Sequence, residues 1–267
     1  MNLYHYTTIE AFRSIIEKNE LWLSERNCMN DVYDENYIKD IVKNILNPNA
    51  SPLFAGSFLD MGFISDKPQY VFSTTTDKDA AHQWLNYGNK NPICIEFDKE
   101  KLVDYFTEYS KSEYNEGIHI YKDDYFSLQV VYDTNEVNKK AEQLVSTYKE
   151  QLLKEFDNII SAPSDQYETA KMEFHNFYAS VKQNNFYAEN EYRFLIYSKR
   201  KPHFRTRENT LVSYLKVHLE KTKLPITGII ISPYTDDESY KNTLNKFLRK
   251  YDYINVSLFL SELHLRR

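Results

Sequence analysis

Residues 3–8, with the sequence Leu-Tyr-His-Tyr-Thr-Thr, lead directly into residues 9–18, Ile-Glu-Ala-Phe-Arg-Ser-Ile-Ile-Glu-Lys. The first part of this stretch reads as a short strand. Thr7 and Glu10 then form a capping box, in which the hydroxyl and the carboxylate each satisfy amide groups at the start of a helix. The apolar residues of the second part recur at helical spacing. The N-terminus therefore predicts a strand followed by a helix with one buried face.

Short apolar or alternating stretches along the rest of the chain predict further strands. They are residues 21–24, 69–73, 92–97, 128–132, 191–197, 226–232 and 254–260. Apolar residues at helical spacing predict helices between them. Those helices fall within residues 27–50, 77–88, 135–160, 166–182 and 236–250. Because helices and strands do not alternate strictly, the fold class that we predict is α+β.

The two predicted helices at 135–160 and 166–182 are separated by a break that contains a proline, at residues 161–163. We interpret this pair as a helical-hairpin insertion over about residues 135–182, packed on the main fold. No linker rich in glycine or serine marks a separate domain. We therefore expect residues 1–267 to form a single domain.

The composition argues against several classes of protein. Hydrophobic residues make up 42% of the 267 and charged residues 27%, which is typical of a globular fold. No stretch approaches the roughly 20 apolar residues of a membrane helix, and the layout of a signal peptide is missing, so we expect a cytoplasmic protein without membrane contact. The five glycines form neither GxGxxG nor GxxxxGK, which disfavours a Rossmann or P-loop enzyme. The two cysteines and seven histidines lack the spacing of a metal site, and we expect none.

Glu189 and Glu191 come directly before or at the start of a strand that should lie in the core. On an extended strand, side chains two residues apart point to the same face, so the two carboxylates would lie within about 7 Å. Such a pair repels unless a site uses it. The alternative interpretation is an ordinary solvated end of a loop.

Two further stretches carry groups that suit a ligand. Ser73 and Thr74 belong to a row of hydroxyls that ends a strand, where they either cap the next helix or bind a ligand. Trp84 and Tyr87 share one face of that helix, where they either pack in the core or stack on a flat ligand.

The stretch at 199–207 is a dense run of basic residues that includes Lys199, Arg200 and Arg205. Interleaved with an aromatic residue and a histidine, it suits a phosphate backbone or a pyrophosphate. The alternative is a solvated hairpin tip. Since the net charge of the chain is −6, any contact with nucleic acid has to use such a local patch.

The order of these stretches resembles the bacterial family of domain of unknown function 2971, from Leu3 to about Leu260. The motifs that carry the resemblance are LYHYT at 3–7, LWLS at 21–24, Asn30-Asp31 with Glu35, Phe72-Ser73, Trp84 to Gly88, Cys94 to Asp98, Glu189 to Arg193 and IIISP at 229–233. Two departures are Tyr192, where the family commonly has tryptophan, and the long helical pair.

That family is in turn remotely similar to the ADP-ribosyltransferases. These enzymes carry a His or Arg on the first strand, a hydroxyl or Tyr element in the middle and a Glu on a later strand; His5, Ser73 and Glu191 occupy that order. The Glu189-Xaa-Glu191 pair looks like the Glu-Xaa-Glu loop of one branch. The resemblance implies a split mixed β-sheet with flanking helices and a cleft that holds NAD between two small sheets.

The same resemblance implies roles for individual residues. Glu191 would stabilise the positive charge that builds on the ribose when the bond to nicotinamide breaks, as in glycoside hydrolysis. Glu189 would position or deprotonate the acceptor. The remaining cofactor-binding residues are His5, which would hydrogen-bond a ribose hydroxyl or the nicotinamide side, Ser73 and Thr74 as the hydroxyl element, and Tyr6, Trp84 and Tyr87 for stacking.

The resulting prediction is an NAD-dependent ADP-ribosyltransferase, in the manner of a toxin or an antiphage effector, that modifies nucleic acid or protein and has a neutralising partner protein. One alternative is a non-catalytic module that binds a nucleotide or a partner in the same place. Another is an RNA 2′-phosphotransferase, whose chemistry relies on a cluster of basic residues of which only His5 and Arg193 are evident. We expect His5, Ser73 and Glu191 to converge if the first prediction holds.

Overall fold

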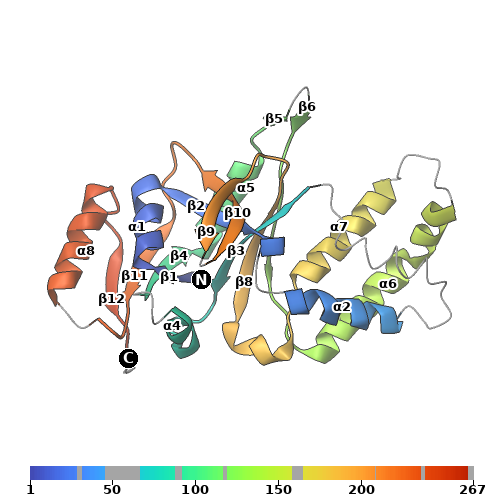
Figure 1. The fold of residues 1–267 in the computed structure, drawn as a ribbon, viewed down its shortest axis with the longest axis horizontal. Coiled ribbons are helices and arrows are strands. Elements are labelled where there is room, and N and C mark those ends of the chain that lie inside the picture. Colours follow the sequence, from blue (N-terminus) through green and yellow to red (C-terminus); the bar gives the residue numbers. More distant parts are fainter. Residues whose placement is uncertain are drawn as a thin grey trace. The chain divides into compact units, whose positions relative to one another are not determined.

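The computed structural model describes residues 1–28, 32–45, 67–87, 92–116, 119–157, 165–207, 209–235 and 238–263. The chain divides into two compact units. Unit 1 consists of residues 1–28, 69–127 and 188–267, and unit 2 of residues 29–68 and 128–187. Each unit is described by itself below, with the elements labelled as in Figure 1.

Among the described residues, unit 1 contains four of the helices and the strands, of which only residues 128 and 129 fall in unit 2. Its strands are β1 (Asn2–Thr8), β2 (Glu20–Glu25), β3 (Gln69–Thr75), β4 (Pro92–Asp98), β5 (Tyr114–Glu116), β6 (His119–Tyr121), β7 (Asp124–Gln129), β8 (Glu191–Tyr197), β9 (His203–Arg207), β10 (Thr210–His218), β11 (Ile226–Ile231) and β12 (Ser257–Leu260). Its helices are α1 (Ile9–Lys18), α4 (Ala81–Tyr87), α5 (Lys99–Ser110) and α8 (Glu238–Lys250), with the 3₁₀ turn η1 (Arg26–Cys28). The 3₁₀ turn η3 (Asn184–Glu189) precedes β8 at the boundary of the two units.

The main sheet of unit 1 is mixed, which together with the helices confirms the α+β class. Its strands follow the order β12-β11-β4-β1-β3-β2-β10-β9, and β8 pairs with both β3 and β7. β11 and β12 are parallel, whereas β1, β3, β4, β8 and β10 pair with their neighbours in antiparallel fashion. β5 and β6 form a separate two-stranded hairpin.

One face of this sheet carries the hydrophobic core of unit 1, and we call it the core face. Helices α1, α5 and α8 contribute apolar side chains to the same core as the strands. Phe12 of α1 contacts Phe247 of α8, and Phe106 of α5 stacks on Phe194 of β8 with 4.7 Å between ring centroids. Helix α4 instead packs on the opposite face, where its Trp84 joins a small second cluster of apolar residues.

Helix α1 begins one residue later than the capping-box prediction implies. The N-cap is Thr8, whose Oγ1 accepts a hydrogen bond from the amide of Ala11 at 3.2 Å. Thr7 is a buried residue of β1, paired with Ile93 of β4. Because β1 runs through Thr8, the second threonine is the one that stands at the helix start and caps it.

Unit 2 is helical in its described part. It contains α2 (Val32–Ile45), α6 (Thr134–Asp157) and α7 (Asp165–Ala179), so the pair of helices predicted at 135–182 is present. Residues of α2, α6 and α7 share one apolar core, centred on Val42, Ala141 and Phe174. α2 therefore belongs with the helical pair as a third helix of the same unit.

The structure also contains elements that the sequence analysis did not predict. They are α5, the β5–β6 hairpin, β9 and β10. The strand expected at 128–132 lies earlier, as β7 at 124–129, while Val131 forms an isolated bridge with Val181. These elements matter below, because β9 and β10 extend the sheet beyond β2.

Candidate functional site

The pairing of β3 places the predicted site residues of the strands. One edge of β3 pairs with β8 along its whole length. The other edge pairs with β1 only at Thr75 and with β2 only at Tyr70 and Val71. Between these points the edge pairs with no strand of the described part of the chain, so the sheet is split there between β1 and β2.

The imidazole of His5 lies at this split. Its Nδ1 is 2.9 Å from the carbonyl oxygen of Ser73, and its ring lies 4.5 Å from that of Phe72. A carbonyl can only accept, so Nδ1 carries the proton and Nε2 is left as an acceptor. Burial lowers the pKa of His5 to about 4, against the effect of the Ser73 carbonyl, and Arg205 adds to the lowering. His5 is therefore a neutral ring that donates to the backbone edge of β3 at the split.

The face of the sheet opposite the core face carries several polar side chains, and we call it the second face. Residues directly opposite each other on paired strands share a face. Thr75 lies opposite Tyr4 on one side and Glu191 on the other, and Ser73 lies opposite Arg193. The second face thus gathers two hydroxyls, a carboxylate and a guanidinium from β3 and β8.

Glu191 and Arg193 form a buried ion pair on the second face. Nη2 of Arg193 donates to Oε2 of Glu191 at 2.8 Å, and the side chains are 5% and 8% exposed, respectively. Removing both charges from water is costly, and such a pair is often no more stabilising than well-packed apolar residues. The burial of this ion pair is therefore weak evidence that Glu191 and Arg193 serve only to stabilise the fold.

Glu189 does not share the extended backbone that the sequence analysis assumed. It ends the 3₁₀ turn η3, and Asn190 has a left-handed φ of 41°. The side chain of Asn190 donates to Asp77 Oδ1 at 2.8 Å, and its carbonyl accepts from the amide of Thr76. The chain therefore turns between the two glutamates, and the rule for side chains two apart on a strand does not apply to them.

Ser73 and Thr74 point to opposite faces of the sheet. Thr74 is buried on the core face, and its Oγ1 donates to the carbonyl of Tyr192 at 2.8 Å. The Oγ of Ser73 is buried on the second face and has no hydrogen-bond partner among the described residues. Of these two predicted hydroxyls, only Ser73 shares a face with Glu191; Thr75, next along that face, was not among the predicted binding residues.

His5 and Glu191 are likewise on opposite faces. Ile95 lies directly opposite His5 on β4 and belongs to the core, as does Phe72, which the His5 ring contacts. The structure thus places His5, Ser73 and Glu191 on three neighbouring strands, β1, β3 and β8. It brings Ser73 and Glu191 together on the second face, whereas the imidazole lies toward the core face. The predicted convergence of all three side chains is therefore wrong, because β1 and β8 pair with opposite edges of β3 in registers that put His5 and Glu191 on different faces.

The aromatic residues predicted to stack on a cofactor pack inside unit 1. Trp84 is fully buried, lies 4.8 Å edge-on to Tyr6, and donates its indole N–H to Asp79 at 2.7 Å. The hydroxyl of Tyr6 accepts from the amide of Ala80 at 2.7 Å. These contacts account for both rings without a ligand. Tyr87 ends α4, and its side chain lies outside the described residues, as do Asn30 and Asp31 and the side chain of Glu35.

Two of the three residues predicted to bind nucleic acid contact the β5–β6 hairpin and the segments on either side of it. Nε of Arg200 donates to the buried Asp123 at 2.8 Å, and its Nη2 donates to the carbonyl and hydroxyl of Ser112. Nζ of Lys199 lies 5.0 Å from the ring of Tyr121. Arg200 in particular is engaged on several sides and has a structural role.

Arg205 lies elsewhere, on β9. Its Nη2 donates to Oγ of Ser24 at 2.8 Å, and its guanidinium lies 5.8 Å from the ring of Trp22 and 5.7 Å from that of Tyr214. Val212, its partner on β10, alternates with Tyr214 along one face. Arg205 therefore belongs to the second face.

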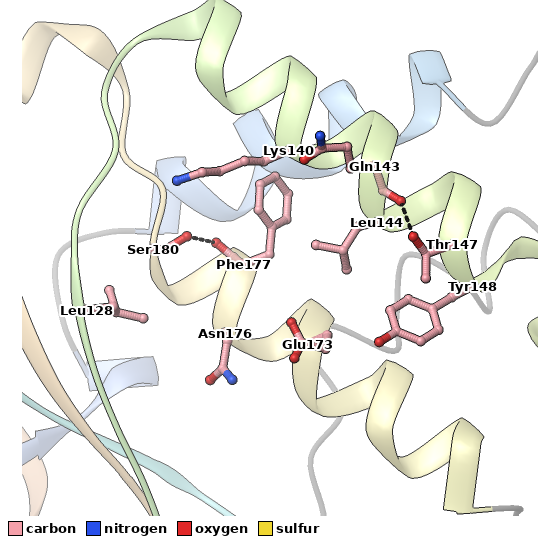
Figure 2. A pocket seen from close by; sticks show the side chains of 10 residues that line it. All are labelled: Leu128, Lys140, Gln143, Leu144, Thr147, Tyr148, Glu173, Asn176, Phe177 and Ser180. Carbon is pink, nitrogen blue, oxygen red and sulfur yellow. Dashed lines mark hydrogen bonds between the residues drawn. The ribbon is translucent and has the colours of Figure 1, made fainter.

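Unit 2 has a groove of about 500 Å³ between α6 and α7, shown in Figure 2. Two of its hydroxyl groups are used locally, since Thr147 donates to the Gln143 carbonyl and Ser180 to that of Phe177. None of the predicted site residues lines it.

The described residues contain no group of three or more His, Cys, Asp or Glu side chains that could hold a metal ion. Within the same residues, no helix combines the length and apolar character needed to cross a membrane. Cys28 and Cys94 are free cysteines.

Residues 83–194 match the family described as Protein of unknown function (DUF2971). This match confirms the resemblance to that family which the order of the sequence motifs predicts. No curated protein and no solved structure matches the chain.

Proposed function

We propose that the chain is an NAD-dependent ADP-ribosyltransferase with an ADP-ribosyltransferase-like fold, and that the second face of the main sheet binds the nicotinamide ribose. The observation that carries the proposal is a buried carboxylate, Glu191, on the same face as the Ser73 hydroxyl, which has no partner among the described residues. A buried polar group without a partner is costly, and a ligand hydroxyl would satisfy it. The split along β3 supports the fold assignment.

The reaction follows from the groups on that face. The bond between C1′ of the ribose and the nicotinamide nitrogen breaks, and neutral nicotinamide leaves with the bonding electrons. Glu191 stabilises the positive charge that develops on the ribose. A lone pair of the acceptor then forms the new bond at C1′. Glu189, which is not on that face but ends the turn η3 just before β8, is assigned the acceptor proton.

Arg193 and His5 act in this proposal as positioning residues. Arg193 lies 2.8 Å from Glu191 and fixes the direction of its carboxylate. His5 occupies the split and donates to the carbonyl of Ser73, which holds the β3 edge where β1 and β2 diverge. The first-strand histidine is thus assigned to the sheet edge rather than to direct contact with a ribose hydroxyl.

The test is incubation of the protein with NAD labelled in the adenylate part, together with RNA, DNA or cell lysate. Wild type should release nicotinamide and label one class of acceptor, and Glu191→Gln should reduce both at least 100-fold. The exposed Glu220 offers a matched control, Glu220→Gln, which should leave both unchanged. Absence of nicotinamide release from wild type with every acceptor would overturn the proposal.

A non-catalytic nucleotide-binding module is the second candidate, and the buried pair of Glu191 and Arg193 favours it. A carboxylate already bound to a guanidinium can serve as a fixed recognition element without turnover. Calorimetry separates the two functions. Binding of NAD or ADP-ribose by wild type, with no nicotinamide released over hours, supports the module.

A further inference from the structure

The second face continues from the proposed catalytic strands across β2, β10 and β9. Ser24 of β2 lies opposite Val71 of β3, and Val71 alternates with Ser73 along the second face. Tyr214 of β10 lies opposite Ser24 on one side and His203 of β9 on the other. These registers put the outer three strands and the proposed ribose-binding strands on one continuous face.

Positive side chains gather on this outer part. Arg205 and Arg207 alternate with His203 along β9, and Lys216 lies opposite Trp22. Lys18 reaches the same place, with Nζ 5.2 Å from the ring of Trp22. We call the set of Lys18, Trp22, His203, Arg205, Arg207, Tyr214 and Lys216 the basic–aromatic surface.

Within the described ranges, a single carboxylate is recorded in contact with the basic–aromatic surface. This carboxylate is Glu20, whose Oε1 accepts from the indole of Trp22 at 2.8 Å and lies 3.9 Å from Nζ of Lys18. The chain as a whole carries a net charge of −6, so this concentration of positive charge runs against the average. Arg207 is exposed, and Lys216 is half-buried.

The aromatic rings are arranged as a platform. Trp22 stacks on Tyr214 with 4.5 Å between centroids, and His203 lies 5.6 Å from Tyr214. Ser24 holds the guanidinium of Arg205 beside both rings. Tyr214 is buried beneath, whereas Trp22 and His203 retain exposure. Rings that receive bases and cations that follow phosphates are the two components of single-strand recognition.

We propose that the basic–aromatic surface binds single-stranded nucleic acid. This inference rests on the proposed function in one respect, namely that the bound strand is also the acceptor of ADP-ribose. Unpaired bases stack on Trp22 while Arg207 and Lys216 contact phosphates. Duplex DNA presents no free base faces, so it binds more weakly. The position of this surface on the same sheet face as Glu191 is what links binding to transfer.

The first test measures binding without NAD, by fluorescence anisotropy with labelled 12-nucleotide single-stranded RNA and DNA and the matching duplex. Wild type should favour single strands at least fivefold, with affinity that falls as salt rises. The double substitution Arg207→Gln and Lys216→Gln should weaken binding at least tenfold and lower the salt slope by about 1.4, since each phosphate contact contributes about 0.7 for single strands.

The control removes the same charges elsewhere on unit 1. Lys246→Gln with Arg249→Gln, both exposed on α8, should change the affinity less than twofold. Circular dichroism shows whether each variant is folded. Equal losses in both pairs, or no binding by wild type at 100 µM protein, would overturn the proposal.

Tryptophan fluorescence gives a second readout. The chain has two tryptophans, and Trp84 is fully buried, so quenching by an oligonucleotide reports on Trp22. Trp22→Phe should abolish the quenching and retain part of the affinity. Quenching that persists in Trp22→Phe would contradict stacking on this ring.

Failure of this inference differs from failure of the proposed function. If the protein releases nicotinamide but has no affinity for oligonucleotides, and labels only lysate proteins, the nucleic-acid surface is contradicted and the transferase function is supported. Oligonucleotide binding that depends on Arg207 and Lys216, without any consumption of NAD, does the reverse.

Discussion

The two faces of the main sheet differ in what they bury. The core face buries apolar side chains under α1, α5 and α8, with Phe106, Phe97 and Phe194 fully buried. The second face buries Glu191 and Arg193 to a similar degree, beside a Ser73 hydroxyl that has no partner among the described residues. Apolar burial stabilises a fold directly, whereas buried charges rarely repay their desolvation. We therefore attribute stability mainly to apolar burial, on the core face and in the smaller cluster under α4, and assign function to the polar part of the second face.

The largest expected effect is on the core face. Phe106 is fully buried and stacks on Phe194 and Tyr125. Phe106→Ala should lower the free energy of unfolding by about 3–5 kcal/mol through lost contacts and a cavity. Urea denaturation measures the loss. The oligonucleotide affinity of the protein that remains folded should stay within twofold of wild type. A larger change would contradict the assignment of stability and function to different faces.

Breaking the ion pair on the second face should rank next. Arg193→Met leaves the Glu191 carboxylate buried without its guanidinium, at a cost of about 3 kcal/mol. Adding Glu191→Gln should recover at least 1 kcal/mol of that loss, since the charge is gone. A double-mutant cycle in urea measures the coupling. If the double variant recovers none of the free energy of unfolding lost in Arg193→Met, the ion pair does not determine the stability of this face.

His5 predicts a dependence of stability on pH. Its pKa of about 4 in the folded protein lies below its ordinary value near 6.5. Between these values the unfolded chain binds more protons, so the free energy of unfolding falls as pH drops from 6.5 toward 4, by about 2–3 kcal/mol. His5→Asn keeps a donor for the Ser73 carbonyl and removes the titration. Its urea midpoints should change less over this range; an unchanged profile would show that His5 is not the group responsible.

The smallest effect is expected at the turn before β8. Asn190 combines a φ of 41° with a hydrogen bond to Asp77. Asn190→Ala loses the bond and retains the strained backbone, at about 1–2 kcal/mol. Asn190→Gly relieves the strain and should cost less. Thermal unfolding ranks the two, and a less stable glycine variant would contradict the assignment of strain.

Much of the fold was predictable because its elements have strong periodicity. β1, β3, β4, β8 and β11 and the helices α1, α6 and α7 lie close to their predicted ranges. α5 was within reach as well, because Leu102, Tyr105, Phe106 and Tyr109 follow helical spacing after the N-cap Asp98. β9 is a short polar strand of basic residues, which carries little apolar alternation to reveal it.

The site was less predictable, for reasons of register. The alternation of β3 separates Thr74 from Ser73 and pairs Ser73 with Thr75 on one face, and a period of two applied to residues 69–75 would have found this. The opposite orientation of His5 and Glu191 depends on how β1 and β8 each pair with β3, which no single segment encodes. The hydrogen bond between Arg200 and Asp123 joins residues 77 apart in the sequence, so no single segment encodes it either.

The most direct measurement is a crystal structure of the protein with a non-hydrolysable carbocyclic analogue of NAD. The proposal predicts that the nicotinamide ribose lies on the second face, within hydrogen-bond distance of the Glu191 carboxylate and the Ser73 hydroxyl. An analogue bound elsewhere on unit 1, with Glu191 still held only by protein groups, would contradict it.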